Sequence, residues 1–373
     1  MRVASPEELK SWTAFQDLCA MLAPGALAPV PARDDEDWAF IVQFASEHMA
    51  SPAVWRAVEH AAAAPEDVKT YFRAVREMNA ARNKNILDGL DQMLALFEER
   101  GIKSVLLKGG ASLVSGLYDD PAERFLLDLD VLVEPGQAAA ADAVLRSVGY
   151  TATGNDDAPP TRWFVPVIQH LPALTSPTGG FVVEIHTGMV GLKKLERMIP
   201  AAAVMERAIS VQWNGRSILV PRPTDFLVHN IVHSQLHHEL HAQGTIELRQ
   251  LRELAFCVAR HRDELDWIDI ERRFADAGRG RVLAEQAIYS KALMGVAFPI
   301  ATPNPDKAIN RLRATMTKSV LKPAPRSPWA ALATTYLRGV LITPRLALNL
   351  LNPLWWPARL RLIRSILRGE RTP

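Results

Sequence analysis

The six residues from Asp128 to Val133 read Asp-Leu-Asp-Val-Leu-Val, and they constrain the fold of this chain more than any other feature. Side chains alternate across a β-strand, so Asp128 and Asp130 share one face while Leu129 and Val131 point into a core. Like charges held this close repel, and burying them is costly unless a cation lies between them. Oxygen ligands at this spacing suit Mg²⁺, which binds carboxylates together with substrate phosphates. The alternative is an exposed pair at a strand edge.

The residues around this strand predict a small sheet between helical regions. Strands are expected at 102–107, 128–133 and 181–185, with helices at 111–117 and 135–148 between them. Apolar spacings of three and four predict further helices at 38–63, 67–100, 224–241, 245–261, 268–277 and 281–294. Ser5-Pro6-Glu7-Glu8 has the pattern of a capped helix start. The fold class is therefore α+β, a small mixed β-sheet core flanked by N- and C-terminal helical regions.

Changes in composition divide the chain into four parts. We expect an N-terminal helical region at 1–100, an α/β core at 101–220, a C-terminal helical domain at 221–320 and a basic tail at 321–373. The net charge of +2 gives no strong signal for nucleic acid. Two distant cysteines, an acidic N-terminus without a long apolar run, and no span of about 18 apolar residues predict a cytoplasmic protein.

Two basic features precede the paired aspartates. Lys108-Gly109-Gly110 lies where a strand is expected to pass into a helix, and glycines there let backbone N–H groups approach a phosphate. An ordinary turn with a solvated lysine is the alternative. Arg124, four residues before Asp128, is a candidate to orient a carboxylate or contact a phosphate, or else forms a surface ion pair.

A third acid occurs in the segment Val182-Val183-Glu184-Ile185-His186. Glu184 and His186 share one face of this expected strand. If the strand lies beside the Asp-bearing strand, Glu184 completes a three-carboxylate cluster for two Mg²⁺ ions and His186 comes within reach of a substrate. A half-exposed edge strand is the alternative.

The order of these motifs resembles the uncharacterised nucleotidyltransferase family of the DNA polymerase β-like superfamily, over about residues 80–260. The resemblance implies that Gly109 and Gly110 form the triphosphate turn and that Asp128, Asp130 and Glu184 are the metal ligands. It gives Lys108 and Arg124 phosphate contacts, and it implies a peptide, sugar or small-metabolite acceptor in natural-product or surface-polysaccharide biosynthesis.

Histidines recur in the predicted helix 224–241, at His229, His233, His237 and His241, with His238 alongside. Neighbours four apart share a helix face, so zinc binding is one reading. The other is a polar face turned to the active-site cleft or to solvent. The resemblance favours cleft-lining roles for His229 and His233.

The tail from Lys322 has nine Lys and Arg residues against one acid. Trp355, Trp356 and the Arg-rich run 359–368 suit a peripheral contact with the inner face of a membrane, or with a partner protein. Packing of this segment on its own protein is the alternative.

The sequence thus predicts a Mg²⁺-dependent enzyme that moves an NMP from an NTP to an unknown acceptor and releases pyrophosphate, with Mn²⁺ as a substitute metal. The longer Gly-to-Asp spacing and Leu127 leave open a catalytically weak nucleotide-binding or partner-docking module with the same fold.

Overall fold

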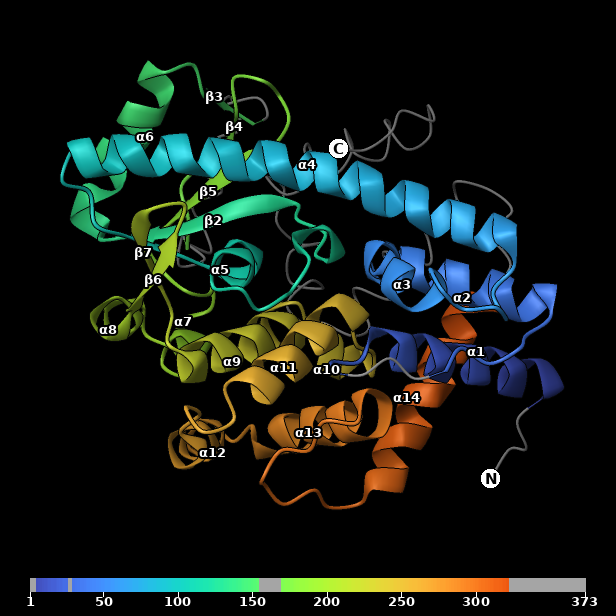
Figure 1. The fold of residues 1–373 in the computed structure, drawn as a ribbon. Coiled ribbons are helices and arrows are strands. Elements are labelled where there is room, and N and C mark those ends of the chain that lie inside the picture. The colour runs from blue at the N-terminus through green and yellow to red at the C-terminus, as the bar shows by residue number, and fades with distance from the viewer. Residues whose placement is uncertain (1–4, 26–28, 154–168, 322–373) are drawn as a thin grey trace, which may run out of the picture. The chain divides into compact units, whose positions relative to one another are not determined.

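Seven strands form one mixed sheet in this computed structural model, which describes residues 5–25, 29–153 and 169–321 (Figure 1). The strand order is β3-β4-β5-β2-β1-β7-β6. The strands are β1 Ser104–Leu106, β2 Asp128–Val133, β3 Thr151–Ala152, β4 Leu174–Thr175, β5 Val182–His186, β6 Ile209–Trp213 and β7 Arg216–Val220. β2 and β5 run parallel, as do β1 and β7, and the other pairs are antiparallel. The expected α+β arrangement is confirmed, with more strands than the three predicted.

Helices cover the sheet and extend beyond it. Before the sheet come α1 Pro6–Leu22, α2 Asp35–Glu47, α3 Ser51–Val58 and α4 Glu66–Glu99. Within it come α5 Lys108–Val114, η1 Pro121–Glu123, η2 Pro135–Gln137, α6 Ala138–Ser147, α7 Lys193–Glu196 and α8 Ala201–Arg207. After it come α9 Pro223–Ile231, η3 Val232–His237, α10 Leu240–Gln243, α11 Leu248–Arg260, α12 Trp267–Asp276, α13 Gly280–Met294 and α14 Pro305–Val320.

The predicted helix starts are partly confirmed. Ser5 caps α1 through a complete capping box with Glu8, as its sequence pattern predicts. The single helix expected at 38–63 is instead two helices, α2 and α3, because the chain turns at Met49, which has a positive φ of 51°. The turn lets α2 and α3 each pack an apolar face.

The long helix α4 crosses the apolar face of the sheet (Figure 1). A Cβ added at Gly89 would lie 2.2 Å from the Phe181 ring, so only glycine allows this close approach. Further along α4, the Asn79 and Asn83 side chains donate to backbone carbonyls of the loop 121–124. α4 therefore holds the loop that leads into β2 and its two aspartates.

All described residues except Leu321 belong to one compact unit, residues 1–156 and 166–320. A second unit, residues 157–165 and 321–373, lies outside the described residues except for Leu321. α1 contacts α13 and α14, so helices from both ends of the described chain pack together. One buried apolar cluster includes side chains from the N-terminal helices, the sheet and the C-terminal helices. The four-part division stays a prediction, and the tail with Trp355, Trp356 and residues 359–368 lies outside the described residues.

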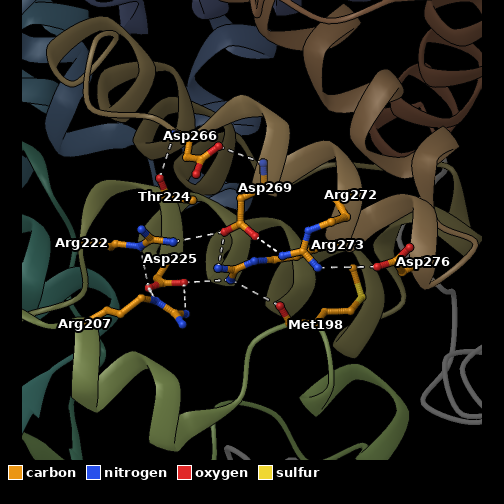
Figure 2. A network of polar contacts seen from close by, with 10 residues as sticks. All are labelled: Met198, Arg207, Arg222, Thr224, Asp225, Asp266, Asp269, Arg272, Arg273 and Asp276. Atoms are coloured by element: carbon orange, nitrogen blue, oxygen red, sulfur yellow. Dashed lines mark hydrogen bonds and ion pairs between the residues drawn. The ribbon is translucent and has the colours of Figure 1, made fainter.

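A buried carboxylate joins three of these segments. Asp225, near the start of α9, is fully buried and accepts hydrogen bonds from three arginines, as Figure 2 shows. The donors come from α8, from the residue before α9 and from α12: Arg207 at 2.9 and 3.0 Å, Arg222 at 3.1 Å and Arg273 at 2.8 Å. Burial favours the neutral acid, but the hydrogen bonds of Arg207 and Arg273 prevail and lower the pKa of Asp225.

Replacing this carboxylate should destabilise the fold, because three arginines would lose their shared partner. We expect Asp225→Asn to lower the free energy of unfolding by about 2–3 kcal/mol, since charge-assisted hydrogen bonds are lost. Urea unfolding followed by circular dichroism measures the change. Asp276→Asn, at the exposed edge of the same network, is the matched control and should shift unfolding by less than about 0.5 kcal/mol. Equal effects of both variants would contradict the assigned role.

Candidate functional site

Two parallel strands bring the predicted acids together. β2 pairs with β5 so that Asp130 lies directly opposite Glu184 and Leu132 opposite His186. Neighbouring residues in register share a face, so Asp128, Asp130, Glu184 and His186 all project from the face opposite α4. The expectation that the Glu-bearing strand lies beside the Asp-bearing strand is therefore correct.

Asp130 is the centre of the polar contacts on this face. Its Oδ1 accepts a hydrogen bond from Lys108 Nζ at 2.6 Å and lies 2.7 Å from His186 Nε2. The same His186 nitrogen lies 3.3 Å from Glu184 Oε2. Asp130 and His186 are buried, with 2% and 0% of their side chains exposed. Asp130, Glu184 and His186 each offer a ligand atom within 4.8 Å of the others, a spacing from which a metal ion could be held.

The pKa values of this cluster move in opposite directions. Burial and the charge of Asp130 raise the pKa of Asp128 to about 6. Burial opposes ionisation of Asp130, but Lys108 and His186 prevail and hold its pKa well below the usual value. The hydrogen bond from His186 lowers the pKa of Glu184. Burial disfavours protonated His186, but its bonds to both carboxylates raise its pKa. A proton on His186 Nε2 therefore lies between the carboxylate of Asp130 on β2 and that of Glu184 on β5.

The Lys108-Gly109-Gly110 turn packs against the loop before β2. Lys108 begins α5 with a positive φ of 48°, an uncommon conformation for a residue with a side chain. A Cβ at Gly109 would lie 2.5 Å from the Leu126 side chain and 2.9 Å from that of Arg124. A Cβ at Gly110 would lie 3.0 Å from the nearest carbon of the Leu106 side chain. Close packing thus requires glycine at Gly109 and favours it at Gly110.

These groups surround a cavity of about 310 Å³. The acids and the glycine turn line it, together with residues of η3 and of the start of α11. The lining residues are Lys108, Gly109, Arg124, Leu126, Leu127, Asp128, Asp130, Gln169, His170, Glu184, His233, His237, His238, Arg249 and Gln250. Of the ten residues predicted for the site, seven line this cavity, while Gly110, His186 and His229 are buried in its walls.

Arg124 is bound to a partner that the sequence motifs did not indicate. Its Nε donates to Glu253 Oε1 at 2.9 Å and its Nη2 to Oε2 at 3.4 Å, while Nη1 donates to the carbonyl of Phe125. The two side chains are 4% and 2% exposed. Glu253 lies in α11, so this buried ion pair fixes the β2 loop to the C-terminal helices.

The histidine segment is not the continuous helix expected at 224–241. α9 passes at Val232 into a π-helical turn, in which the His238 N–H donates to the His233 carbonyl. The five-residue spacing of that turn places the His233 and His238 rings 4.4 Å apart. Glu239 then takes a left-handed φ of 59° and ends the turn. His241 instead contacts Glu285, at 3.1 Å.

His233 lines the cavity and His229 lies buried behind it, their rings 5.7 Å apart. Six further polar lining residues were not predicted for the site: Gln169, His170, His237, His238, Arg249 and Gln250. His170 pairs with His186 through an isolated antiparallel backbone bridge, a contact with no local sequence signal. Within residues 5–25, 29–153 and 169–321, the histidine segment forms no group of three metal-ligand atoms within 4.8 Å.

The same described residues contain no helix long and apolar enough to cross a membrane.

Comparison with protein families gives a match. Residues 34–295 match the model of a family described as uncharacterised nucleotidyltransferase, and this span includes every residue of the cavity. No curated protein and no solved structure matches the chain. The matched span covers well over half of the 373 residues and extends beyond the 80–260 inferred from the motifs. The chain therefore belongs to the uncharacterised nucleotidyltransferase family.

Proposed function

We propose that this protein transfers a nucleoside monophosphate from a Mg²⁺-bound NTP to an acceptor and releases pyrophosphate. The observation that carries the proposal is the direct pairing of Asp130 with Glu184 on parallel strands, at the wall of a cavity that also exposes Asp128 and Lys108. Its family supports the class of reaction, nucleotide transfer.

The donor set fits a hard divalent cation. Asp128, Asp130 and Glu184 supply carboxylate oxygens from one face of the sheet, and such oxygens are the ligands that Mg²⁺ prefers. The raised pKa of Asp128 reflects burial beside other carboxylates, a repulsion that a bound cation would relieve. We propose these three residues as the ligands of two Mg²⁺ ions, with Mn²⁺ as a substitute. Metal ions bound there would supply charge neutralisation on the attacking and leaving oxygens.

Other side chains and the glycine turn hold the carboxylates and the nucleotide in place in this proposal. Protonated His186 Nε2 contacts Asp130 Oδ1 and Glu184 Oε2 at 2.7 and 3.3 Å, which keeps both carboxylates aimed at the cavity. Lys108 and the backbone of Gly109 lie at the cavity wall, where we propose that they contact the phosphate being transferred. Gly110 supports that turn through its packing on Leu106.

For the remaining predicted residues we propose indirect roles. Arg124 holds the wall in place through Glu253 and adds positive potential to the cavity. His233 lines the cleft, and His229 supports it from behind.

One observation favours a second candidate, a nucleotide-binding or partner-docking module with little catalysis. Lys108 Nζ lies 2.6 Å from Asp130 Oδ1, and Arg124 is fully engaged with Glu253 and Phe125. Two cations expected to meet phosphate are thus already paired with carboxylates. In that case nucleotide would bind without turnover.

Metal removal separates these functions. We expect at least one NTP to raise the melting temperature in Mg²⁺ and to lose that effect in EDTA, because the carboxylates repel phosphates without a cation. Pyrophosphate release with radiolabel transfer to candidate acceptors then measures turnover. Metal-dependent binding without turnover on any acceptor would support the docking module. No thermal response to any NTP would contradict nucleotide binding altogether.

The acceptor and the location are proposed on sequence and family grounds. We propose a peptide, sugar or small metabolite as the acceptor, within natural-product or surface-polysaccharide biosynthesis, and a cytoplasmic site of action. The basic tail is proposed to contact a membrane surface or a partner protein.

A further inference from the structure

One part of the cavity wall differs in chemistry from the part that carries the acids. Its lining residues come from η3 and from the start of α11, and we call them the basic wall: His233, His237, His238, Arg249 and Gln250. No carboxylate belongs to this set. The acids of the cavity, Asp128, Asp130 and Glu184, all come from β2 and β5. The acids thus reach the cavity from β2 and β5, which we call the acidic side, and the basic wall reaches it from η3 and α11.

Arg249 is the charged group of the basic wall. Its Nε donates to Glu247 Oε1 at 2.7 Å and its Nη1 to the Phe125 carbonyl at 3.3 Å, and its side chain is only 12% exposed. Nη2 has no hydrogen bond within the described part of the chain. Burial and the nearby positive charge of Arg124 lower the pKa of Arg249. A guanidinium in these surroundings gains from an anionic ligand.

The imidazoles beside Arg249 add neutral donors. The His237 ring lies 5.6 Å from that of His233 and 5.2 Å from that of His238. Burial, and the positive charges around them, lower the pKa of each of the three, to about 4 for His237. Each neutral ring carries one N–H. His237 lines the cavity, and its buried Nδ1 has no hydrogen-bond partner among the described residues, so no hydrogen bond at Nδ1 fixes which ring nitrogen carries the N–H.

The other cations of the cavity, Lys108 and Arg124, are also paired with carboxylates. Lys108 is held at the acidic side by Asp130, and the three guanidinium nitrogens of Arg124 all donate to Glu253 or to Phe125. Phosphates that extend away from the acidic side would therefore meet Arg249 and the imidazoles first.

We propose that the basic wall binds the terminal phosphates of the nucleotide, and the pyrophosphate that they become, through Arg249 and the N–H groups of His237 and His238. This inference rests on the proposed function, because it assumes that the transferred phosphate lies at Asp130 and Glu184. It assigns the nucleotide a direction in the cavity, with its terminal phosphates toward α11.

Inorganic tripolyphosphate with Mg²⁺ is the direct probe, since it contains the proposed group and no base. We expect Arg249→Met to weaken its binding by about 10–100-fold, the loss of charge-assisted hydrogen bonds. Binding of AMP, which lacks the terminal phosphates, should change less than about twofold. Arg260→Met is the matched control, because Arg260 lies on the same helix but is 41% exposed and pairs with Asp119 on the surface. Titration calorimetry measures binding to the wild type and to both variants.

Further variants keep the test decisive if Arg249→Met does not fold. Arg249→Lys should retain more tripolyphosphate affinity than His237→Asn combined with His238→Asn. Unchanged tripolyphosphate affinity in folded Arg249 variants would overturn the basic wall, even where NTP binding persists. If wild type binds no NTP but binds tripolyphosphate through Arg249, the proposed function fails and the anion site stands.

Discussion

Asp130→Asn is expected to reduce nucleotidyl transfer by about 10²–10³-fold, the scale of losing one electrostatic group in an active site. The carboxylate is 2% exposed and contacts both Lys108 and His186. An amide keeps the shape but cannot hold a cation, and it leaves the Lys108 ammonium without its nearest counter-charge. Pyrophosphate release under saturating NTP and Mg²⁺ measures the loss, and binding of Mn²⁺ followed by electron paramagnetic resonance gives an independent readout.

Stability must be measured alongside, because Asp130 also supports the fold. We expect Asp130→Asn to lower the free energy of unfolding by about 2–3 kcal/mol, since its hydrogen bonds to charged groups are weakened. Asp142→Asn, on α6 and paired with Arg146, is the control that should change neither quantity. Wild-type turnover or Mn²⁺ affinity in folded Asp130→Asn would refute the metal assignment.

The sequence predicted the acid cluster because its signals are local. Alternation within six residues places Asp128 and Asp130 on one face, and the same rule pairs Glu184 with His186. The sequence did not show that β2 and β5 are neighbours in the sheet. The parallel register of the two strands confirms that they are.

One missed element had a local signal. The segment from Ile209 to Val220 contains Asn214-Gly215 between alternating apolar residues, which is a strong hairpin pattern. Both turn residues have positive φ, 48° and 77°, as a type I′ turn requires. The β6–β7 hairpin was therefore predictable, and it adds two strands beside β1.

Other features had no local signal. The turn at Glu239 occurs without glycine or proline, where helix periodicity continues through His241. Glu253 lies 129 residues from Arg124 in the sequence, so no residue near either of them predicts their ion pair. Features that depend on such long-range contacts, including the position of Arg249 at the cavity, come only from the fold.

Breaking the ion pair of Arg124 with Glu253 is expected to have a second large effect, on the free energy of unfolding. We expect Glu253→Gln to lower the free energy of unfolding by about 3–5 kcal/mol, the cost of leaving a buried charge without its partner. Arg124 would remain 4% exposed with no full counter-charge. Urea unfolding measures the loss, and Glu264→Gln, an exposed acid near the end of α11, is the control. A change below about 1 kcal/mol would show that the pair does not stabilise the fold.

The double variant Arg124→Met with Glu253→Leu separates the structural role of Arg124 from a phosphate contact. Removing both charges should restore most of the lost stability, because no unpaired ion remains. Burial opposes ionisation of Glu253, but Arg124 prevails and lowers its pKa, so the pair stabilises the fold above the usual value of 4.5 and less as the pH falls. The double variant should therefore lose less stability than wild type between neutral pH and about pH 3. If its NTP affinity matches wild type, Arg124 acts only on the fold, whereas a loss of about tenfold or more would assign it a direct contact with the nucleotide.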